Sequence, residues 1–341
     1  MGRLNVGTIR CTVASKEHCF QQRKLLRGLL KRLHPVEHHL QFIPPRPRDM
    51  RVLLVGASGF IGRSIAIKTP EHVELTGTYY RNKPEIENIR LEQFNFLDTS
   101  VDWSALVEQY DCIIIAARAN GDTESNRNEV SKQASDAFTR FIGAVQECES
   151  KPFIVTLNGS LSYGECGEKL VKTDGQINPT GYARSYAIAE KPLRDFLSKG
   201  QDVAIIRAPW VIGASSWFPM MYLHASRIPI IGSGMQWMSL VSVDDLAEYV
   251  WKAVASSKSG VLHPQLTYRC RQMEFAEIVH EVTSKKKRRI GILRRQRMEI
   301  QMRESVLASI RLDDGFANQS EEQTNRERLK SFIEEIHSGF S

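Results

Sequence analysis

Three glycines with the spacing G-x-x-G-x-x-G, Gly56, Gly59 and Gly62, follow a short apolar run over residues 52–55. In such a turn the first glycine permits the bend, the second lets the backbone approach a pyrophosphate, and the third lets helix and strand pack closely. Unpaired N–H groups at the start of the helix attract phosphates. The spacing therefore predicts a dinucleotide site. Its expected contacts are Gly56, Ser58, Gly59, Phe60, Ile61, Gly62 and Arg63.

The elements that must position this turn alternate along the chain between strand-like and helix-like stretches. Strands are expected over residues 73–80, 112–117, 153–157 and 203–207, and helices over 102–109, 124–148 and 182–197. Such alternation predicts an α/β fold, a Rossmann-type doubly wound parallel sheet. The ligand crevice of such a sheet lies at the carboxyl ends of its strands. Gly56, Tyr80, Ala117 and Asn158 are expected there.

This pattern divides the chain into three segments. Residues 50–207 are expected to form the dinucleotide-binding domain. Residues 208–341 are expected to form a substrate-covering region with C-terminal helices, interleaved with the Rossmann core, because prolines and glycines interrupt the alternation after residue 207. Residues 1–49 are basic and carry a Pro-rich break, so they indicate either a loosely attached extension or an organelle-targeting segment; the first interpretation is favoured.

Composition limits the class of protein. The chain has 341 residues, of which 42% are hydrophobic and 25% charged, as in soluble globular proteins. No apolar run approaches the roughly 20 residues of a transmembrane helix. The six cysteines form no C-x-x-C pair, which favours a reduced compartment, and the protein is expected in the cytoplasm unless the N-terminus directs it to an organelle. No metal site is expected.

The chain has a net charge of +7, and residues 285–297 form a basic block. Such a block could contact nucleic acid or an anionic membrane, but solvated charge around a strand is favoured. No aromatic side chains are interleaved with it to stack on bases, so no nucleic-acid partner is expected.

Residues 50 to about 256 resemble the extended short-chain dehydrogenase/reductase family, in its epimerase/dehydratase-like branch. The resemblance rests on six landmarks in one order. They are Gly56-x-x-Gly59-x-x-Gly62, Asn95-Phe96-Leu97-Asp98, Ile115-Ala116-Ala117, Ser162-Tyr163-Gly164, Arg207-Ala-Pro-Trp-Val-Ile-Gly213, and Gly232-x-Gly234-x-Gln236 leading to Val243-Asp244-Asp245. The resemblance implies that Asn95 and Phe96 line the adenine, and that Ala116 and Ala117 line the adjoining ribose and phosphates.

The expected cofactor is NADP, with NAD as the alternative. In sites that prefer NAD, an acidic residue after the second strand binds the ribose 2′-hydroxyl. Here that position holds no acid, while Arg81 and Lys83 are available for a 2′-phosphate and Arg63 could add a contact. The alternative interpretation is that Arg81 and Lys83 are solvated loop charges.

The resemblance also implies catalytic positions, and here the chain departs from the family pattern. Tyr182 matches the tyrosine of the family's Tyr-x-x-x-Lys pair, but Tyr186 stands where the lysine should be. The family's serine or threonine position is Gly159, with Ser160 adjacent. An unassisted tyrosine has a pKa near 10 and is a poor general acid or base at neutral pH.

The positions that the resemblance assigns to substrate binding also depart from the family pattern. Met238 stands where many sugar-nucleotide enzymes of the family carry an arginine, and Trp210 and Trp217 add apolar bulk nearby. This apolar stripe is interpreted first as core and second as a pocket for an apolar small molecule. Two hypotheses remain. One is an oxidoreductase or epimerase that acts on a small, largely apolar ketone or alcohol with Tyr182 as acid–base residue; the other is a dinucleotide-binding sensor, assembly subunit or cofactor-independent catalyst. A homodimer is possible, because helices 124–148 and 182–197 often pair between subunits in relatives.

Overall fold

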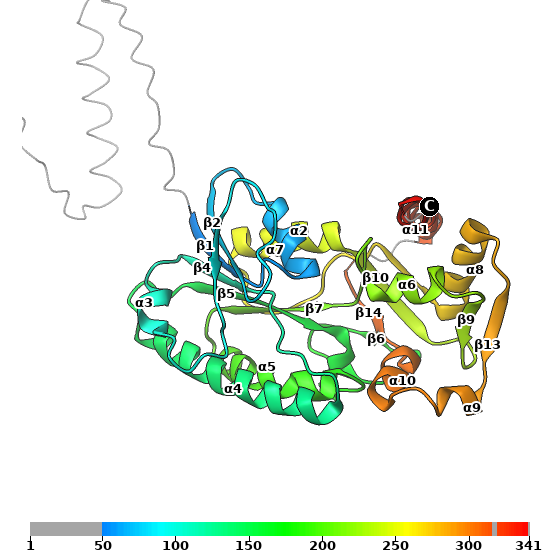
Figure 1. Cartoon of the computed structure of the whole chain (residues 1–341), viewed down its shortest axis with the longest axis horizontal. Helices are drawn as coiled ribbons and strands as arrows, with labels where there is room; N and C mark the ends of the chain where they lie inside the picture. The colour runs from blue at the N-terminus through cyan, green and yellow to red at the C-terminus, as the bar shows by residue number, and fades with distance from the viewer. Residues whose placement is uncertain (1–49, 316–318, 340–341) are drawn as a thin grey trace, which may run out of the picture. The chain divides into compact units, whose positions relative to one another are not determined.

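The computed structural model describes residues 50–315 and 319–339, without the side chains of residues 319–324. Contacts between residues divide the chain into two units, Met1–Arg48 and Asp49–Ser341. The expectations for residues 1–49 lie outside the described residues, and so does the boundary residue Asp49. Figure 1 shows the described part of the second unit as layers of helices around a twisted sheet.

The central sheet has seven strands in the order β11-β7-β5-β4-β1-β2-β3, and every neighbouring pair is parallel. The strands are β1 (Met50–Val55), β2 (Val73–Tyr79), β3 (Arg90–Gln93), β4 (Cys112–Ile115), β5 (Phe153–Gly159), β7 (Val203–Ala208) and β11 (Gly260–Leu262). Strand order reverses at β1, which lies between β2 and β4, so the sheet has the switch point at which doubly wound folds bind ligands. The predicted Rossmann-type fold is confirmed.

Helices cover both faces of this sheet (Figure 1). On one face lie α2 (Phe60–Ile67) and α7 (Val243–Ser256); on the other lie α3 (Trp103–Val107), α4 (Glu124–Glu147) and α5 (Ala183–Ser198). Side-chain caps start three of them: Asp102, Thr123 and Ser242 each accept a hydrogen bond from a backbone N–H of the first turn. Such caps satisfy donors that the helix itself leaves unpaired.

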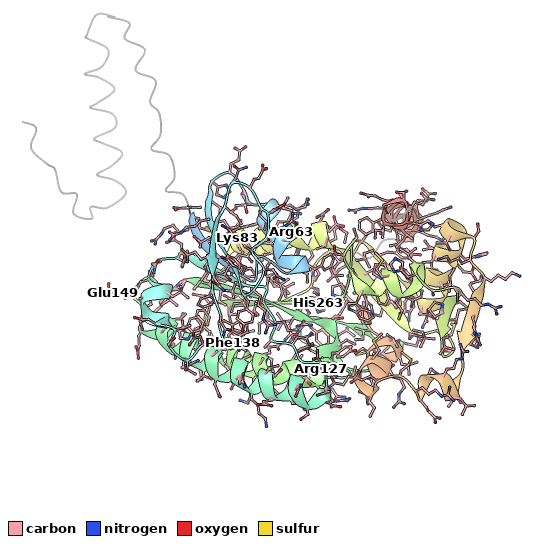
Figure 2. The ribbon with its side chains drawn as sticks, in the orientation of Figure 1. Arg63, Lys83, Arg127, Phe138, Glu149 and His263 are labelled. Carbon is pink, nitrogen blue, oxygen red and sulfur yellow. The ribbon has the colours of Figure 1, made fainter. Side chains whose placement is uncertain are left out.

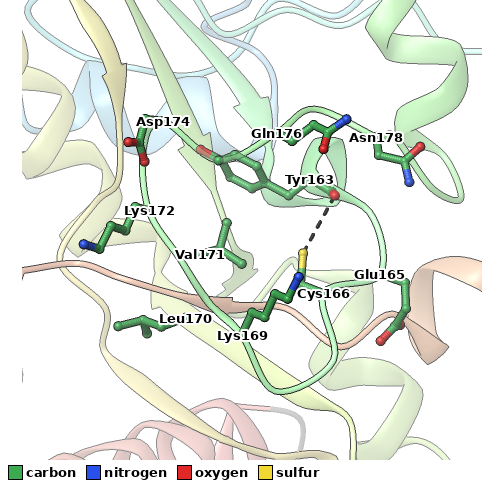
Figure 3. A pocket seen from close by; sticks show the side chains of 11 residues that line it. Tyr163, Glu165, Cys166, Lys169, Leu170, Val171, Lys172, Asp174, Gln176 and Asn178 are labelled. Atoms are coloured by element: carbon green, nitrogen blue, oxygen red, sulfur yellow. Dashed lines mark hydrogen bonds between the residues drawn. The ribbon is translucent and has the colours of Figure 1, made fainter.

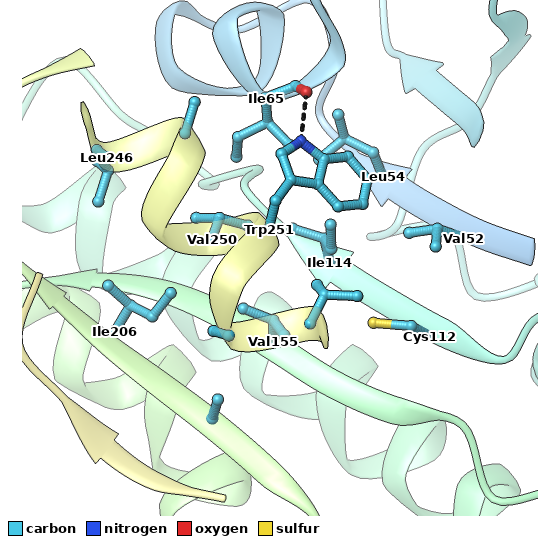
Figure 4. Packing of buried hydrophobic residues seen from close by; sticks show 14 of the residues in the cluster. Val52, Leu54, Ile65, Cys112, Ile114, Val155, Ile206, Leu246, Val250 and Trp251 are labelled. Carbon is cyan, nitrogen blue, oxygen red and sulfur yellow. Dashed lines mark hydrogen bonds between the residues drawn. The ribbon is translucent and has the colours of Figure 1, made fainter. Parts of the chain in front are cut away.

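Helix α7 fixes the position of α2, and thereby of the glycine turn. The Trp251 indole Nε1–H donates to the carbonyl oxygen of Ile65 at 2.9 Å, and the Ser64 hydroxyl donates to Asp244 at 2.8 Å. Figure 4 shows Trp251 packed against Leu54 and Ile114 of the sheet. Residues about 180 positions later in the chain therefore hold the first helix in place.

A second core lies beyond the sheet and contains α6 (Trp217–Leu223), α8 (Gln272–Thr283) and α11 (Gln319–Ser338). Its strands form small sheets, β12-β10-β8 and β13-β9. They are β8 (Trp210–Ile212), β9 (Ile228–Ile231), β10 (Trp237–Ser242), β12 (Tyr268–Arg271) and β13 (Lys287–Ile290). The remaining elements are η1 (Ser160–Tyr163), α9 (Ile292–Arg295), α10 (Ile300–Leu307) and the strand pair β6 (Leu170–Val171) and β14 (Arg311–Leu312).

The expected elements of residues 50–207 are all present, with ends shifted by one or two residues. Two strands in this range were not anticipated, the edge strand β3 and the two-residue strand β6. The short edge strand β3 reads Arg-Leu-Glu-Gln and has no apolar run to reveal it, because an edge strand with two half-exposed faces buries little. The separation into residues 50–207 and 208–341 stays a prediction.

Candidate functional site

The glycine turn has the geometry of a phosphate cradle. Gly56 has a φ of +97°, and a Cβ there would lie 2.8 Å from the Ala117 backbone. A Cβ on Gly62 would lie 2.0 Å from the Gly56 carbonyl oxygen. A Cβ on Gly59 would instead meet nothing closer than 3.4 Å, so the space above this exposed glycine is open. Neighbouring protein atoms therefore leave no space for a side chain at Gly56 and Gly62, whereas Gly59 leaves room for a ligand.

The helix that follows the turn favours an anion. Gly59 is the N-cap residue of α2, and neither a capping side chain nor an acidic residue occupies the first turn. The N–H groups and the positive end of the helix dipole therefore face the open space above Gly59. The residues present fit a pyrophosphate, as the sequence predicts.

A surface hollow next to α2 brings two of the expected cations together. Arg63 and Lys83 both line it, together with Asn88 and two carboxylates, Glu85 and Glu87. Figure 2 shows Arg63 and Lys83 close to each other beside β2 and α2. Arg81 differs from them, because its guanidinium lies over the ring of its neighbour Tyr80, 5.1 Å from the ring centre.

A narrow cleft at the carboxyl ends of β4 and β5 collects several other predicted residues. Phe96, Ala117, Asn158 and Tyr186 line it together with Arg118. Phe96 stacks on Phe138 of α4, with ring centres 5.6 Å apart. Asn95 does not line this cleft; its side chain accepts a hydrogen bond from the Leu97 backbone at 3.2 Å and shapes the turn. Ala116 is half-buried at the end of β4.

Tyr182 lies under helix α10. Its hydroxyl points to the sulfur of Met302 at 3.5 Å, and the Arg127 guanidinium lies 4.9 Å from its ring centre. Burial raises the pKa of Tyr182, and the nearby Glu299 carboxylate raises it further. A general acid–base tyrosine needs the opposite shift.

Polar contacts attach α10 to the start of α5 and to α4. The buried Arg127 guanidinium donates to Gln301 at 2.7 Å and to Glu299 at 2.7 Å. Ser305 accepts the Tyr182 backbone N–H at 3.2 Å, and Glu304 accepts the Gly181 N–H at 3.2 Å. This arrangement closes the approach to the Tyr182 hydroxyl from the side of α10.

Tyr186 stands one helical turn after Tyr182. Its hydroxyl donates to the Asn120 side chain at 3.1 Å, and the Arg118 guanidinium lies 4.1 Å above its ring. The nearest lysine along the helix, Lys191, is exposed and pairs with Asp195 at 2.5 Å. In the part of the chain that the structure describes, neither tyrosine makes a hydrogen bond or a ring contact with a lysine.

A buried ion pair lies behind this cleft. Glu190 accepts hydrogen bonds from both terminal guanidinium nitrogens of the fully buried Arg207, at 2.5 and 2.6 Å. Asn158 also donates to Glu190, and Arg207 donates to Ser162 at 3.2 Å. Sequence reasoning did not identify Glu190, although its position four residues after Tyr186 on one helix face is a usable signal. Ser160 is buried in η1 and makes no described hydrogen bond to Tyr182.

The predicted substrate residues lie in the second core. Met238 is 3% exposed within β10, and Trp210 stacks on Phe218 with ring centres 4.4 Å apart. Trp217 is partly exposed and contacts both of these rings edge-on. The first interpretation of the apolar stripe, as core, matches this packing; a role in substrate binding stays a prediction.

A third cavity, of about 430 Å³, lies at the loop after η1 (Figure 3). Tyr163, Cys166 and Asp174 are among its lining residues. The buried Tyr163 hydroxyl lies 2.7 Å from His263 Nε2, and His263 Nδ1 lies 2.7 Å from the Asp313 carbonyl oxygen. A carbonyl only accepts, so Nδ1 carries the proton and Nε2 accepts from Tyr163. Burial lowers the pKa of His263 and raises that of Tyr163 to about 12.

Fold and site together define a Rossmann-type dinucleotide-binding protein. A family model, "NAD dependent epimerase/dehydratase family", matches residues 52–266, and the chain belongs to this family. A nicotinamide dinucleotide is the cofactor class that the family and the glycine turn support.

Solved structures share the fold at low sequence identity. UDP-N-acetylglucosamine 4-epimerase from Methanobrevibacter ruminantium M1, in complex with UDP-N-acetylmuramic acid, is 18% identical with a TM-score of 0.66, covering 86% of this chain and 99% of that chain. MoeE5 in complex with UDP-glucose and NAD is 19% identical with a TM-score of 0.64, covering 85% and 100%. DesIV, a dTDP-glucose 4,6-dehydratase from Streptomyces venezuelae with NAD and TYD bound, is 15% identical with a TM-score of 0.60, covering 83% and 96%.

The comparison with curated proteins found no match. Among the described residues, no helix combines the length and apolar character needed to cross a bilayer. Nor do the described His, Cys, Asp and Glu side chains form a group of three or more that could hold a metal ion.

Proposed function

We propose that this protein binds NADP(H) at the glycine turn, and that Tyr182 does not support hydride transfer to or from a substrate. In this proposal it is a dinucleotide-binding sensor, an assembly subunit or a catalyst whose reaction does not depend on the cofactor. The observation that carries the proposal is the environment of Tyr182. Its hydroxyl lies against the Met302 sulfur, its pKa is raised by burial, and no described lysine forms a hydrogen bond with it.

The preference for the phosphorylated cofactor rests on Arg63 and Lys83. Both line the hollow beside α2, where two cations can bind a 2′-phosphate. No acidic residue stands at the end of β2 to bind a ribose hydroxyl, since β2 ends at Tyr79 and Tyr80, Arg81 and Asn82 follow. Glu85 and Glu87 in the same hollow oppose the phosphate, so we expect Arg63 and Lys83 to contribute together.

The chain's own residues account for binding in the following way. The N–H groups after Gly59 and the start of α2 hold the pyrophosphate, and Arg63 holds the adenosine end. A bound nicotinamide can accept or donate a hydride. A protein group must move a proton alongside that hydride when a ketone is reduced, and Tyr182 in its present surroundings holds its proton too tightly at neutral pH.

Binding is tested by titrating the full chain with NADPH and following the cofactor fluorescence. Gly59→Ala should keep the fold, since its Cβ meets only a 3.4 Å contact, yet weaken NADPH binding by about tenfold or more because the methyl group enters the phosphate space. Gly143→Ala in α4 is the matched control, with nothing within 4 Å of the new Cβ. Equal affinities of the two variants would refute the cofactor site.

Cofactor preference is tested by comparing NADPH with NADH in two arginine variants. Arg63→Ala should reduce the NADPH-over-NADH preference by about tenfold, the scale of one charge-assisted contact. Arg81→Ala should change it much less, because the Arg81 side chain lies over Tyr80. A loss confined to Arg81→Ala would reverse this assignment.

The absence of redox turnover is tested by incubating NADPH-loaded and NADP-loaded protein with UDP-sugars, dTDP-sugars and small apolar ketones and alcohols. We expect no change in nicotinamide absorbance and no epimerised product. Turnover that disappears in Tyr182→Phe would overturn the proposal and establish Tyr182 as the acid–base residue.

A second candidate is an oxidoreductase or epimerase that acts on a small, largely apolar ketone or alcohol after α10 has moved away from Tyr182. The observation that favours it is Arg127, whose charge lowers the pKa of Tyr182 and would continue to do so once Glu299 had left. In this case turnover should increase when α10 is detached. Unchanged inactivity with α10 detached would exclude this candidate.

A further inference from the structure

The most basic stretch of the chain lies on the second core, away from the cofactor site. Residues 285–298 contain eight cations and no acidic residue. This basic segment includes β13, the four-residue helix α9 and the turns around them. Within the described part of the second unit, Figure 1 shows β13 and α9 at the side away from β1 and β2.

Exposed aliphatic side chains are concentrated in the same place. Ile292 is 65% exposed and Leu293 is 78% exposed, the highest value among the large hydrophobic residues that the structure describes. Ile300, also exposed, follows a few residues later. Three of the eight exposed large hydrophobics of the described chain therefore fall within nine residues. Single exposed aliphatics are common, but such a concentration marks an interaction surface.

Local structure explains why these side chains remain exposed. β13 pairs only with β9 in a two-stranded sheet, and Gly291 then starts α9. A helix of four residues has too few side chains to form a buried face, and none of its residues is buried. Ile292 and Leu293 consequently project from the segment into solvent.

Most of the cations in the basic segment are not used inside the protein. Lys285 donates to the Leu223 carbonyl oxygen, and Lys287 pairs with Glu277. Five further cations are exposed and form no ion pair with any residue of the described chain: Lys286, Arg288, Arg289, Arg294 and Arg297. Two projecting aliphatics are thus surrounded by uncompensated positive charge.

We propose that this surface binds a phospholipid bilayer that carries anionic headgroups. Ile292 and Leu293 would enter the interface between headgroups and acyl chains, while Arg288, Arg289 and Arg294 contact phosphates. A short apolar tip surrounded by cations is the arrangement of side chains that binds such an interface. This proposal does not depend on cofactor binding or on any reaction at Tyr182.

Two other polyanions fit the surface less well. Nucleic acid would leave the aliphatic tip in water, and the basic segment has no aromatic side chain to stack on bases. An acidic protein would have to bury many charges, whereas protein interfaces are depleted of charge at their centres. Only a bilayer offers anionic groups and an apolar layer at adjacent depths.

The test is co-sedimentation of the full chain with vesicles of phosphatidylcholine containing phosphatidylglycerol, against phosphatidylcholine alone. The wild type should bind the anionic vesicles, and binding should weaken as salt is added because the charges are exposed. The double variant Arg288→Glu/Arg289→Glu should lose about tenfold or more in partitioning. Lys132→Glu/Lys199→Glu makes the same charge change at exposed positions elsewhere and should stay within about twofold of the wild type.

A second variant tests the apolar contact separately. Ile292→Ser/Leu293→Ser keeps all the charges, and it should also lose about tenfold in partitioning, the scale expected when several buried CH₂ groups are removed. Both variants change exposed side chains, so an unchanged circular dichroism spectrum and melting temperature should accompany the loss.

Several outcomes would overturn the proposal. If Arg288→Glu/Arg289→Glu and Ile292→Ser/Leu293→Ser both bind anionic vesicles as the wild type does, another part of the chain supplies the affinity. If the serine variant alone is unaffected, the surface attracts anions without inserting. Tighter binding to duplex DNA or to polyglutamate than to the vesicles, at the same salt concentration, would assign the surface to a different class of partner.

Discussion

Among the contacts made by individual side chains, the buried ion pair between Arg207 and Glu190 has the largest expected effect on stability. Arg207→Met removes the cation and leaves the Glu190 carboxylate buried with only Arg194, 3.2 Å away, and Asn158 as polar partners. We expect the free energy of unfolding to fall by about 3 kcal/mol, measured by urea denaturation, because the buried carboxylate loses its bidentate partner and keeps only the partly exposed Arg194 as a cation. Removing both charges in Arg207→Met/Glu190→Met should recover much of the loss, and a double variant less stable than the single one would contradict this explanation.

The His263 imidazole makes the stability of the protein depend on pH. Burial lowers the pKa of His263, so the folded protein holds it neutral while the unfolded chain takes up a proton below about pH 6.5. Stability rises with pH wherever the unfolded state binds more protons. The contribution of His263 is therefore complete above about pH 6.5 and is lost as the pH falls towards the lowered pKa.

Urea unfolding measured at several pH values between neutral and about pH 5 tests this dependence. His263→Gln should flatten the dependence of the unfolding free energy on pH, and His72→Gln, at an exposed position, should leave it as in the wild type. Equal slopes in all three proteins would show that other groups cause the acid sensitivity.

For individual residues, the sequence predicts the features that depend on local spacing. It does not predict the features that depend on contacts between distant positions of the chain. The glycine turn follows from three glycines and the flanking apolar pattern, and its geometry fits a phosphate as expected. The partners of Tyr182 could not be found in this way, because Met302 and Arg127 are 120 and 55 positions away in the chain. Only the fold brings them together.

Among the elements, α10 decides whether Tyr182 can be reached. The helix lies against Gly181, whose φ is +56°, and a Cβ on Gly181 would lie 2.0 Å from the Ser305 hydroxyl oxygen and 2.8 Å from the Gln301 carbonyl oxygen. Gly181→Ala should therefore displace α10. We expect faster amide hydrogen exchange over residues 300–307 and a greater reactivity of the Tyr182 phenol towards tetranitromethane.

Gly200→Ala is the matched control for this change. Gly200 has a φ of +74°, so alanine there carries a similar backbone cost, but nothing lies within 4 Å of the new Cβ. Exchange over residues 300–307 should then match the wild type. Similar exchange in the two variants would mean that backbone strain, and not contact with Ser305, accounts for the effect.

The sequence does not reveal α10, for a physical reason. α4 and α5 are revealed by apolar residues at helical spacing, because they bury an apolar face against the sheet. α10 instead buries Gln301 and Ser305, whose hydrogen bonds to Arg127, Ser185 and Tyr182 fix its position. A helix that docks through polar side chains leaves no periodic apolar signal.

At the scale of the whole molecule, the later part of the chain belongs to both cores. α7 packs on the Rossmann sheet, and β11 adds its last strand beside β7, although both follow the point where the sequence alternation ends. α8 and α11 belong to the second core. Interleaving of this kind predicts that the two cores unfold as one cooperative unit, because the Rossmann core is completed by α7 and β11, which lie between segments of the second core in the chain.

Ile333 in α11 tests this cooperativity, because it is fully buried in the second core together with Leu329. Ile333→Ala should lower the free energy of unfolding by about 2–5 kcal/mol through lost burial and a residual cavity, whereas Ile67→Ala, at a position 63% exposed, should change it by less than about 0.5 kcal/mol. Hydrogen exchange measured in increasing urea should show α11 and β1 losing protection at the same concentration, and that concentration should fall together for both elements in Ile333→Ala. If α11 lost protection first while β1 stayed protected, the second core would be a separate folding unit, and the crossing of α7 and β11 would not couple the two.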